Sequence, residues 1–488
     1  MNRTRWTGPV RLALTAVVAG GLVTMATLSP AAEVVLSDAR PAGATTLEPV
    51  VSAALSCPGP EFSGIPGVED IDVPASLGAA TAPDSVLGSS VKITGKGQLS
   101  VSSGKGTGDP TTERAQSTTV EDLADGQATD VVGTGALAPG LAAAQEWAVT
   151  RPEIRGLATV SCAGPGSDLW LLAGGGAAGR QERLILTNPG ANEVTVDLQV
   201  LGSKGVVPAP TGSTVVPARG RVALLVDAIT GAEASPAVRV RASGGSVRAV
   251  MSDIWLDGSV PAGAETTVPT AAPSTRQVIP AALMRAGGSI RIAVPDRQQA
   301  VVSARVIGAN GPVPVPGGGV LRVPGQSTGE LALAGLAQGA YAVEVTADVP
   351  IVASLFASWR VGKAPGDFIW APSTAPTTGL LGGAYPKADS ARRRIVNVVS
   401  TGGPAQVSVT WRAAGAWKTQ SYDLGPDTSQ SLEVADAEAV WVRRVSGSGE
   451  VRASVGALGE SPVGQLASVA PLVDSVVTSS VSRAHPVS

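Results

Sequence analysis

The sequence of 488 residues has one histidine, His485, which lies three residues before the last one. Ser-His-Asp and Cys-His catalysis needs an imidazole held between a nucleophile and a carboxylate, and many zinc sites use histidine ligands. We expect residues 477–488 to be a disordered tail, which cannot hold an imidazole in place. This excludes most known catalytic arrangements, and we predict no catalytic, cofactor-binding or metal-binding residue.

Charged and aromatic residues are also few. Charged residues make up 15% of the chain, against roughly 25% in a typical soluble protein, and aromatic residues make up 3%. The net charge is −3 and no basic block follows the extreme N-terminus, which excludes the electrostatic surface of a nucleic-acid-binding protein. The chain is instead rich in valine, with 60 Gly and 37 Pro. This mixture is typical of short strands separated by turns.

Residues 1–32 have the layout of an export signal. Arg3, Arg5 and Arg11 precede an uncharged stretch, and small residues follow it. Cleavage near Ala32 would release the chain, whereas an uncleaved segment would anchor it in the membrane. Both alternatives place the rest of the chain outside the cytoplasm.

The two cysteines lie in similar frames, Ser-Cys-Pro-Gly-Pro around Cys57 and Ser-Cys-Ala-Gly-Pro around Cys162. In an exported chain such a pair most simply forms one disulfide, since a metal pair would need further ligands. The disulfide would close a separate N-terminal β-rich region, residues 33–166. Within it we expect the polar stretch 104–130 to be a long loop.

Three similar segments follow at a spacing near one hundred residues, which we predict to be domains 167–275, 276–375 and 376–476. In each, a run of alternating valines is followed by an apparent hairpin: 238–241 with 247–250, 343–345 with 351–353, and 440–443 with 451–453. Six or seven short strands per copy predict an all-β fold of tandem immunoglobulin-like β-sandwich domains. A propeller is the main rival, although its blades usually take about half this length.

Each copy ends at a Gly-x-x-Pro, and in two copies a tryptophan stands three residues before the glycine. These repeat-structural positions are Trp255, Gly258 and Pro261, Trp359, Gly362 and Pro365, and Gly459 and Pro462. Because their place recurs, we predict that both tryptophans pack in the core. Exposed Trp faces stacking on sugars, as in a carbohydrate-binding module, are the alternative.

Two further patterns resemble known sites. Asp253, Asp257 and Glu265 form an acidic group, but Asp367 and Glu460 hold the same loop in the other copies, so we interpret them all as ordinary loop acids. A carboxylate glycosidase is the alternative. The pattern Gly174-x-Gly-x-x-Gly179 lacks room for the helix that would bind a dinucleotide, and we predict a turn.

The paired cysteine frames, the segment 186–190 (Leu-Thr-Asn-Pro-Gly) and the N-terminal segment together resemble an uncharacterised family of actinobacterial cell-envelope proteins. The resemblance implies one N-terminal membrane segment and a β-rich body outside the cytoplasm. It assigns no catalytic residues. We therefore predict a non-enzymatic envelope protein whose partner is another envelope protein or cell-wall glycan.

Overall fold

The computed structural model describes residues 46–63, 73–88, 91–103, 106–107, 110–123, 126–208, 213–231, 233–285, 287–315, 317–377, 379–387 and 392–481. The predicted export segment and His485 lie outside the described residues. Contacts divide the chain into a unit of residues 48–479 and a second unit of residues 1–47 and 480–488. No helix in the described part of the chain is long and apolar enough to cross a membrane.

The unit of residues 48–479 contains four modules around apolar cores: modules 1, 2 and 4 each have two antiparallel sheets, and in module 3 a long strand shared by both halves joins them into one eight-stranded sheet. Module 1 has β2 (Ser52–Cys57), β3 (Ala75–Thr81), helix α2 (Asp84–Leu87), β4 (Gly97–Ser103), β5 (Gly106–Thr107), β6 (Ser117–Leu123), β7 (Thr129–Gly135), β8 (Leu141–Thr150) and β9 (Arg155–Ser161). Module 2 has β10 (Asp168–Leu172), β11 (Arg180–Thr187), β12 (Val194–Gly202), β13 (Gly205–Val207), β14 (Ser213–Val216), β15 (Arg221–Leu225), helix α3 (Asp227–Thr230), β16 (Ala237–Ser243), β17 (Arg248–Asp257) and β18 (Val260–Thr267). Module 3 has β19 (Ser274–Met284), β20 (Gly288–Ala293), β21 (Ala300–Gly308), β22 (Gly311–Pro314), β23 (Val320–Val323), β24 (Thr328–Ala332), β25 (Gly339–Ser358) and β26 (Phe368–Pro372). Module 4 has β27 (Leu380–Ala384), β28 (Arg392–Thr401), β29 (Ala405–Ala413), β30 (Ala416–Leu424), β31 (Thr428–Glu433), β32 (Ala437–Gly447), β33 (Glu450–Gly459), β34 (Leu466–Pro471) and β35 (Val473–Asp474).

The strands form because valines alternate with polar residues. In β12, Val194, Val196 and Leu198 are buried, whereas Thr195 and Asp197 between them are exposed. The prediction of an all-β fold is confirmed.

The modules share one strand order. In module 1 the sheets are β2-β7-β4-β5 and β6-β3-β8-β9, and the same order recurs as β10-β16-β12-β13 and β15-β11-β17-β18, and as β27-β32-β29-β30 and β31-β28-β33-β34. The N-terminal region predicted to stand apart therefore contains a fourth copy. The predicted loop 104–130 is wrong in part, because it contains β5 and β6. Strand β6 is largely polar and exposed, so it lacks the apolar alternation that reveals a strand.

The predicted hairpins are wrong. Strand β16 pairs with β10 and β12 in one sheet. The next strand, β17, pairs with β11 in the other sheet, where β15 pairs with the opposite edge of β11. The chain thus crosses from one sheet to the other at Gly244, instead of turning back within one sheet. In module 3 this crossing is made within a single strand, β25, whose first half pairs with β19 and β21 and whose second half pairs with β20 and β26. In an immunoglobulin domain, by contrast, the corresponding two strands pair with each other.

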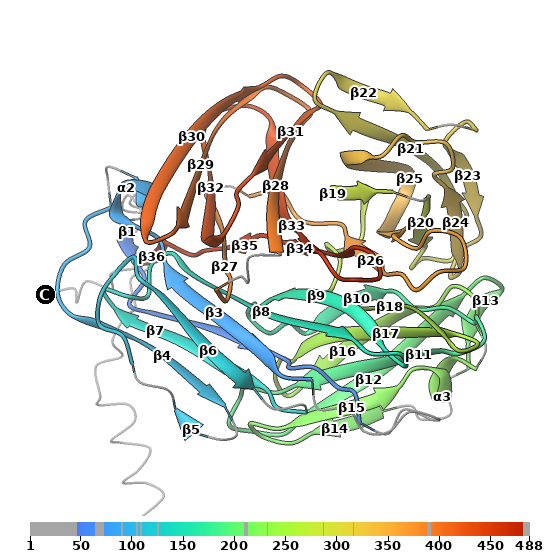
Figure 1. Cartoon of the computed structure of the whole chain (residues 1–488), viewed down its shortest axis with the longest axis horizontal. Coiled ribbons are helices and arrows are strands. Elements are labelled where there is room, and N and C mark those ends of the chain that lie inside the picture. The colour runs from blue at the N-terminus through green and yellow to red at the C-terminus, as the bar shows by residue number, and fades with distance from the viewer. Residues whose placement is uncertain are drawn as a thin grey trace, which may run out of the picture. The chain divides into compact units, whose positions relative to one another are not determined.

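The four modules follow one another around a common centre (Figure 1). Their cores are continuous: the core of module 2 includes Phe368 and Trp370 from module 3, and that of module 3 includes Leu458 and Val469 from module 4. The core of module 4 includes Ala144 from module 1, which closes the sequence of contacts.

Two short strands lie at the ends of the described chain. Strand β1 (Thr46–Pro49) pairs with β36 (Thr478–Val481). The segment 477–488 was expected to be a disordered tail. This is wrong for the residues of β36, and residues 482–488 lie outside the described residues.

Candidate functional site

The last strands of the four modules meet at one place, which we call the hub: β9, β18, β26 and β34 together with Asp367. Strand β9 lies against β18 and β34, and β26 lies against the same two strands. Small residues allow this close approach. A Cβ added at Gly156 in β9 would lie 2.2 Å from the carbonyl oxygen of Ala264 in β18.

Asp367 joins all four modules through its carboxylate. Its oxygens accept hydrogen bonds from the backbone N–H groups of Leu157 (3.2 Å) in module 1, Ala264 (3.4 Å) in module 2 and Ala467 (3.0 Å) in module 4, and from Phe368 (2.9 Å) in its own module. The side chain is 0% exposed. Burial raises the pKa of Asp367 to about 8, and the four N–H donors oppose this rise.

Three more carboxylates lie in one cross-strand row of module 2. Glu182, Asp253 and Glu265 are direct partners across β11, β17 and β18, and each is about 1% exposed. Burial, and then the charge of Asp253, raises the pKa of Glu182 to about 9. Burial, and then the charge of Asp367, raises the pKa of Glu265 well above its usual value. We infer that the row carries fewer than three negative charges at neutral pH.

The interpretation of these residues as loop acids is wrong for Asp253, Glu265 and Asp367, all of which are buried. It agrees with the structure only for Asp257 and Glu460, which are exposed. Asp257 pairs with Arg360 at 2.7 Å.

Asp253 also ties module 2 to module 3. It accepts hydrogen bonds from Arg180 Nε (2.8 Å) and from Trp370 Nε1 (2.7 Å) of module 3. The Arg180 guanidinium lies 5.3–5.8 Å from the ring centres of Trp255, Phe356, Phe368 and Trp370. An arginine enclosed by aromatic faces and ion-paired at its tip is held in one place.

The glycine-rich turn of residues 174–179, beside this cluster, is hydrogen-bonded to other parts of the protein. The N–H of Gly175 donates to Glu182 Oε1 (2.6 Å), and the carbonyl of Gly174 accepts from Arg291 Nη2 (2.9 Å) of module 3. Gly174 and Gly179 adopt positive φ angles of 79° and 75°, which explains glycine at these positions.

Module 4 is joined to module 1 by a buried ion pair that the sequence analysis missed. Glu146 of β8 accepts hydrogen bonds from Arg392 (2.9 Å) and Arg394 (2.7 Å) of β28. Although burial alone would raise it, the two arginines lower the pKa of Glu146. A signal was present for Glu146, which is the only charged residue of the mostly apolar β8, because a charge buried in a folded chain must find a partner.

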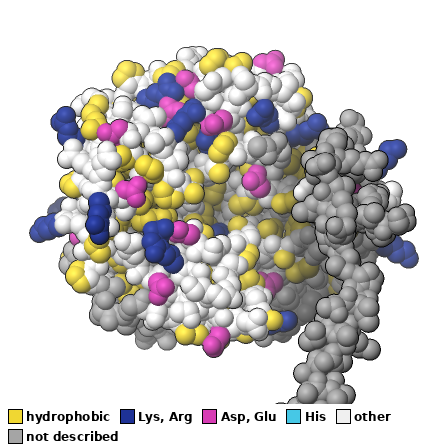
Figure 2. Space-filling model, turned by 180° about the vertical axis from the view of Figure 1, so that it is seen from behind, with side chains coloured by type: hydrophobic (Ala, Val, Ile, Leu, Met, Phe, Trp, Pro, Cys, Tyr) yellow, Lys and Arg dark blue, Asp and Glu magenta, His cyan; other side chains and the backbone are white. Residues whose placement is uncertain are grey.

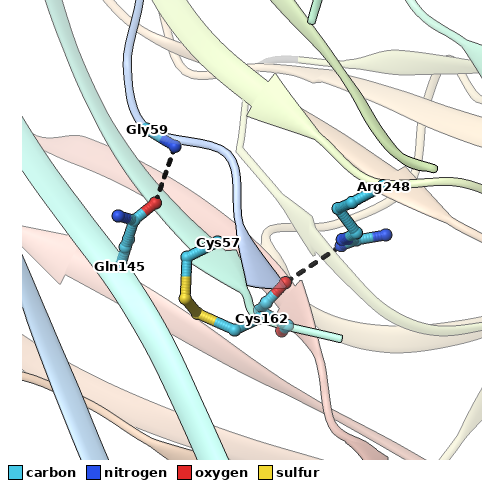
Figure 3. Close-up of a disulfide and its surroundings, with 6 residues drawn as sticks. Cys57, Gly59, Gln145, Cys162 and Arg248 are labelled. Carbon is cyan, nitrogen blue, oxygen red and sulfur yellow. Dashed lines mark hydrogen bonds between the residues drawn. A yellow bond between two sulfur atoms is a disulfide. The ribbon is translucent and has the colours of Figure 1, made fainter. Parts of the chain in front are cut away.

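The predicted disulfide between Cys57 and Cys162 is confirmed. Both cysteines are fully buried, and the bond joins the first strand of module 1 to the residue after its last strand (Figure 3). Two contacts flank it: Gly59 N–H donates to Gln145 Oε1 (3.0 Å), and Arg248 of module 2 donates to the carbonyl of Ser161 (3.0 Å).

The repeat-structural residues have different roles. Trp359 is buried in the core of module 3 and donates to the carbonyl of Leu283 (2.9 Å), whereas Trp255 is half-buried beneath Arg180. Gly258 and Gly362 have positive φ angles of 66° and 60°. Gly459 instead ends β33 in a regular strand conformation, followed by Pro462 in a turn, while Pro261 lies in β18 and Pro365 precedes β26. None of the eight tryptophans in the described residues is exposed.

This arrangement can hold modules together, and its acids are sealed from solvent. Among the described residues, no group of three His, Cys, Asp or Glu side chains could hold a metal ion. The opposite face from Figure 1 shows hydrophobic side chains near its middle, with Lys and Arg interspersed among Asp and Glu (Figure 2). A surface cavity of about 550 Å³ lies in module 1, with Asp84, Lys96 and Arg114 in its wall.

No curated protein matches the sequence. A family model described as a family of unknown function, DUF5719, matches residues 117–435, from the start of β6 to just beyond β31, which is well over half of the chain. The chain therefore belongs to the DUF5719 family.

Proposed function

We propose that this chain is a non-enzymatic protein of the cell envelope, located outside the cytoplasm, which presents a ring of four modules to another envelope protein or to cell-wall glycan. The N-terminal segment would export the chain and either be cleaved or remain as a membrane anchor. An actinobacterial source, which the resemblance implies, is part of the same proposal.

The observation that carries the proposal is that the buried carboxylates form hydrogen bonds with neighbouring modules. Of the acidic group considered for a glycosidase, Asp253 and Glu265 are buried and bond to side chains of neighbouring modules, and the buried Asp367 bonds to backbone groups of neighbouring modules. A carboxylate glycosidase needs two acids facing each other across a cleft open to substrate. The buried disulfide supports an oxidising compartment.

For the modules, we propose a β-sandwich architecture that is immunoglobulin-like in its alternating core and modified in its strand order. Division into independently folding domains at residues 167, 276 and 376 is part of the prediction. Expression of residues 167–275 alone, with its unfolding followed by circular dichroism, tests whether a single module folds.

The location can be tested by cell fractionation with intact-mass measurement of the mature chain. We expect the chain outside the cytoplasm, with a mass beginning near residue 32 or 33 if it is released and at Met1 or Asn2 if it is anchored. Recovery of the full chain in the cytosol with reduced cysteines would overturn the proposed location.

The absence of enzymatic activity is tested separately with a screen against wall glycans and peptides. We expect no turnover above that of a heat-denatured control. Turnover that is lost on changing Asp257→Asn, an exposed position, would show that the chain is a hydrolase.

A further inference from the structure

The surface cavity of module 1 is lined by charged, polar and apolar residues. Thr94, Gly95, Lys96 and Thr112 are exposed lining residues. Ile93, Ala136 and Leu137 are apolar lining residues, and of these Leu137 is buried. A volume of about 550 Å³ is in the range of sites for small organic ligands.

Arg114 is fixed in the wall by its own contacts. Its Nε donates to Asp84 Oδ1 (2.7 Å), its Nη1 to the carbonyl of Ala136 (2.6 Å), and its Nη2 to the carbonyls of Ala82 (2.7 Å) and Pro139 (3.0 Å). These bonds use four of its five N–H groups. The guanidinium is therefore preorganised, with one Nη1 hydrogen not used by these bonds.

The charges of the wall do not cancel. Lys96 and Arg114 contribute two positive charges, and Asp84 contributes one negative charge. Asp84 forms an ion pair with Arg114 through one of its oxygens. Burial lowers the pKa of Arg114, and the hydrogen bond and charge of Asp84 oppose this decrease. A ligand with an anionic group near Lys96 would complete the neutralisation.

We propose that this cavity binds a hydroxyl-bearing carboxylate, of which a uronic acid unit of a polysaccharide is the simplest example. The carboxylate would lie between Lys96 and the Nη1 edge of Arg114. Sugar hydroxyls would meet Thr94, Thr112 and the exposed oxygen of Asp84, and the C–H face of the ring would lie over Ile93 and Leu137. The inference deepens the proposed function, because it names the chemistry of the wall glycan that such a protein would recognise.

Calorimetric titration of the full mature chain with glucuronate, glucose and inorganic phosphate tests the inference. Glucuronate and glucose differ in one carboxylate, and phosphate supplies the anion without the ring. We expect binding of glucuronate, with glucose and phosphate each at least about tenfold weaker, because each lacks one half of the recognition.

Two lysine variants provide the matched comparison. Lys96→Gln should weaken glucuronate binding by about tenfold, whereas Lys92→Gln, an exposed lysine outside the cavity wall, should leave it unchanged. Both residues are exposed, so neither change should affect folding, which thermal melting checks.

No detectable glucuronate binding, equal affinity for glucose, or insensitivity to Lys96→Gln would each overturn the inference. Tight phosphate binding in place of glucuronate would show an anion site without sugar recognition and would also overturn it. These results leave the proposed function standing, since that rests on fractionation and on the turnover screen.

Discussion

At the scale of single residues, the carboxylate of Asp367 stands out because it is hydrogen-bonded to the backbone of all four modules. The N–H groups that it satisfies lie on strand edges that have no strand partner at the hub. Backbone donors buried in this way must be paired by some acceptor. The Asp367 side chain therefore accepts hydrogen bonds from backbone N–H groups that sheet pairing leaves without an acceptor.

Replacing this residue should be costly. We expect Asp367→Asn to lower the free energy of unfolding by about 2–4 kcal/mol, because the amide nitrogen would face N–H donors instead of accepting from them. Urea denaturation followed by tryptophan fluorescence measures the change.

Asp257→Asn is the matched control, since it breaks only an exposed pair with Arg360. It should cost less than about 1 kcal/mol. Equal losses for the two variants would contradict the role assigned to Asp367.

At the scale of strands, the packing at the hub depends on missing side chains. Strands β9 and β18 approach so closely at Gly156 that a methyl group would collide with the backbone of Ala264. We expect Gly156→Ala to destabilise the fold by about 1–3 kcal/mol through overpacking. Gly164→Ala, in open space beside the disulfide, should change little, and thermal melts of both variants would separate a steric effect from a general effect of glycine.

The disulfide reinforces a contact that every module makes. In each, the segment after the last strand is hydrogen-bonded to the first strand, as in Ala163 with Ser56 and Thr374 with Val278. We expect replacement of both Cys57 and Cys162 by Ala to cost about 2–5 kcal/mol, since the bond closes a loop between residues 105 apart in sequence. Chemical denaturation of the wild-type chain and of the double variant measures the difference in the free energy of unfolding. A loss below about 1 kcal/mol would show that the hydrogen bonds alone hold the first strand to the segment after the last strand.

Several strands could be predicted from the sequence, but not their partners. The alternation at Val194, Val196 and Leu198 shows which face is buried. It does not show which sheet a strand joins, because the two sheets share one core and an alternating strand fits either. The crossing between β16 and β17 was therefore read as a hairpin. The fourth copy was missed since β3 (Ala-Ser-Leu-Gly-Ala-Ala-Thr) and β6 have few large apolar residues.

The site was harder to predict than the strands. Cys57 and Cys162 could be paired from composition and compartment. Asp253 and Asp367 could not be recognised as buried, since their partners Trp370, Leu157 and Ala467 come from modules up to 210 residues away in sequence. A charged residue next to a Gly-x-x-Pro turn looks like a loop residue until the neighbouring module covers it.

At the scale of the whole molecule, the buried acids make stability depend on pH. Burial and the charge of Asp253 raise the pKa of Glu182 to about 9, so the folded chain keeps a proton that the unfolded chain releases at lower pH. The protonated form contributes fully below the unfolded value near pH 4, and this contribution decreases as the pH rises and is lost at about pH 9. We expect the unfolding midpoint to fall as the pH rises from about 5 to about 9 and to level off above that.

The variant Glu182→Gln should flatten this profile between about pH 5 and 9, because the amide is neutral throughout. Melting curves at half-unit pH intervals test the expectation. A wild-type midpoint that rises across the same range, or an unchanged slope in the variant, would show that Glu182 is ionised in the folded chain at neutral pH.

The contact between the backbone N–H of Val50 and the carbonyl of Val477 brings the first and last strands of the folded unit side by side. A folded unit whose first and last strands lie side by side can be circularly permuted: a short linker between them and a new opening at the exposed residues 272–273, between the second and third modules, should yield a permutant with the same four lobes. In such a permutant the third and fourth lobes are synthesised before the first and second, so the ring itself, and not the order of its parts along the chain, would define the native state.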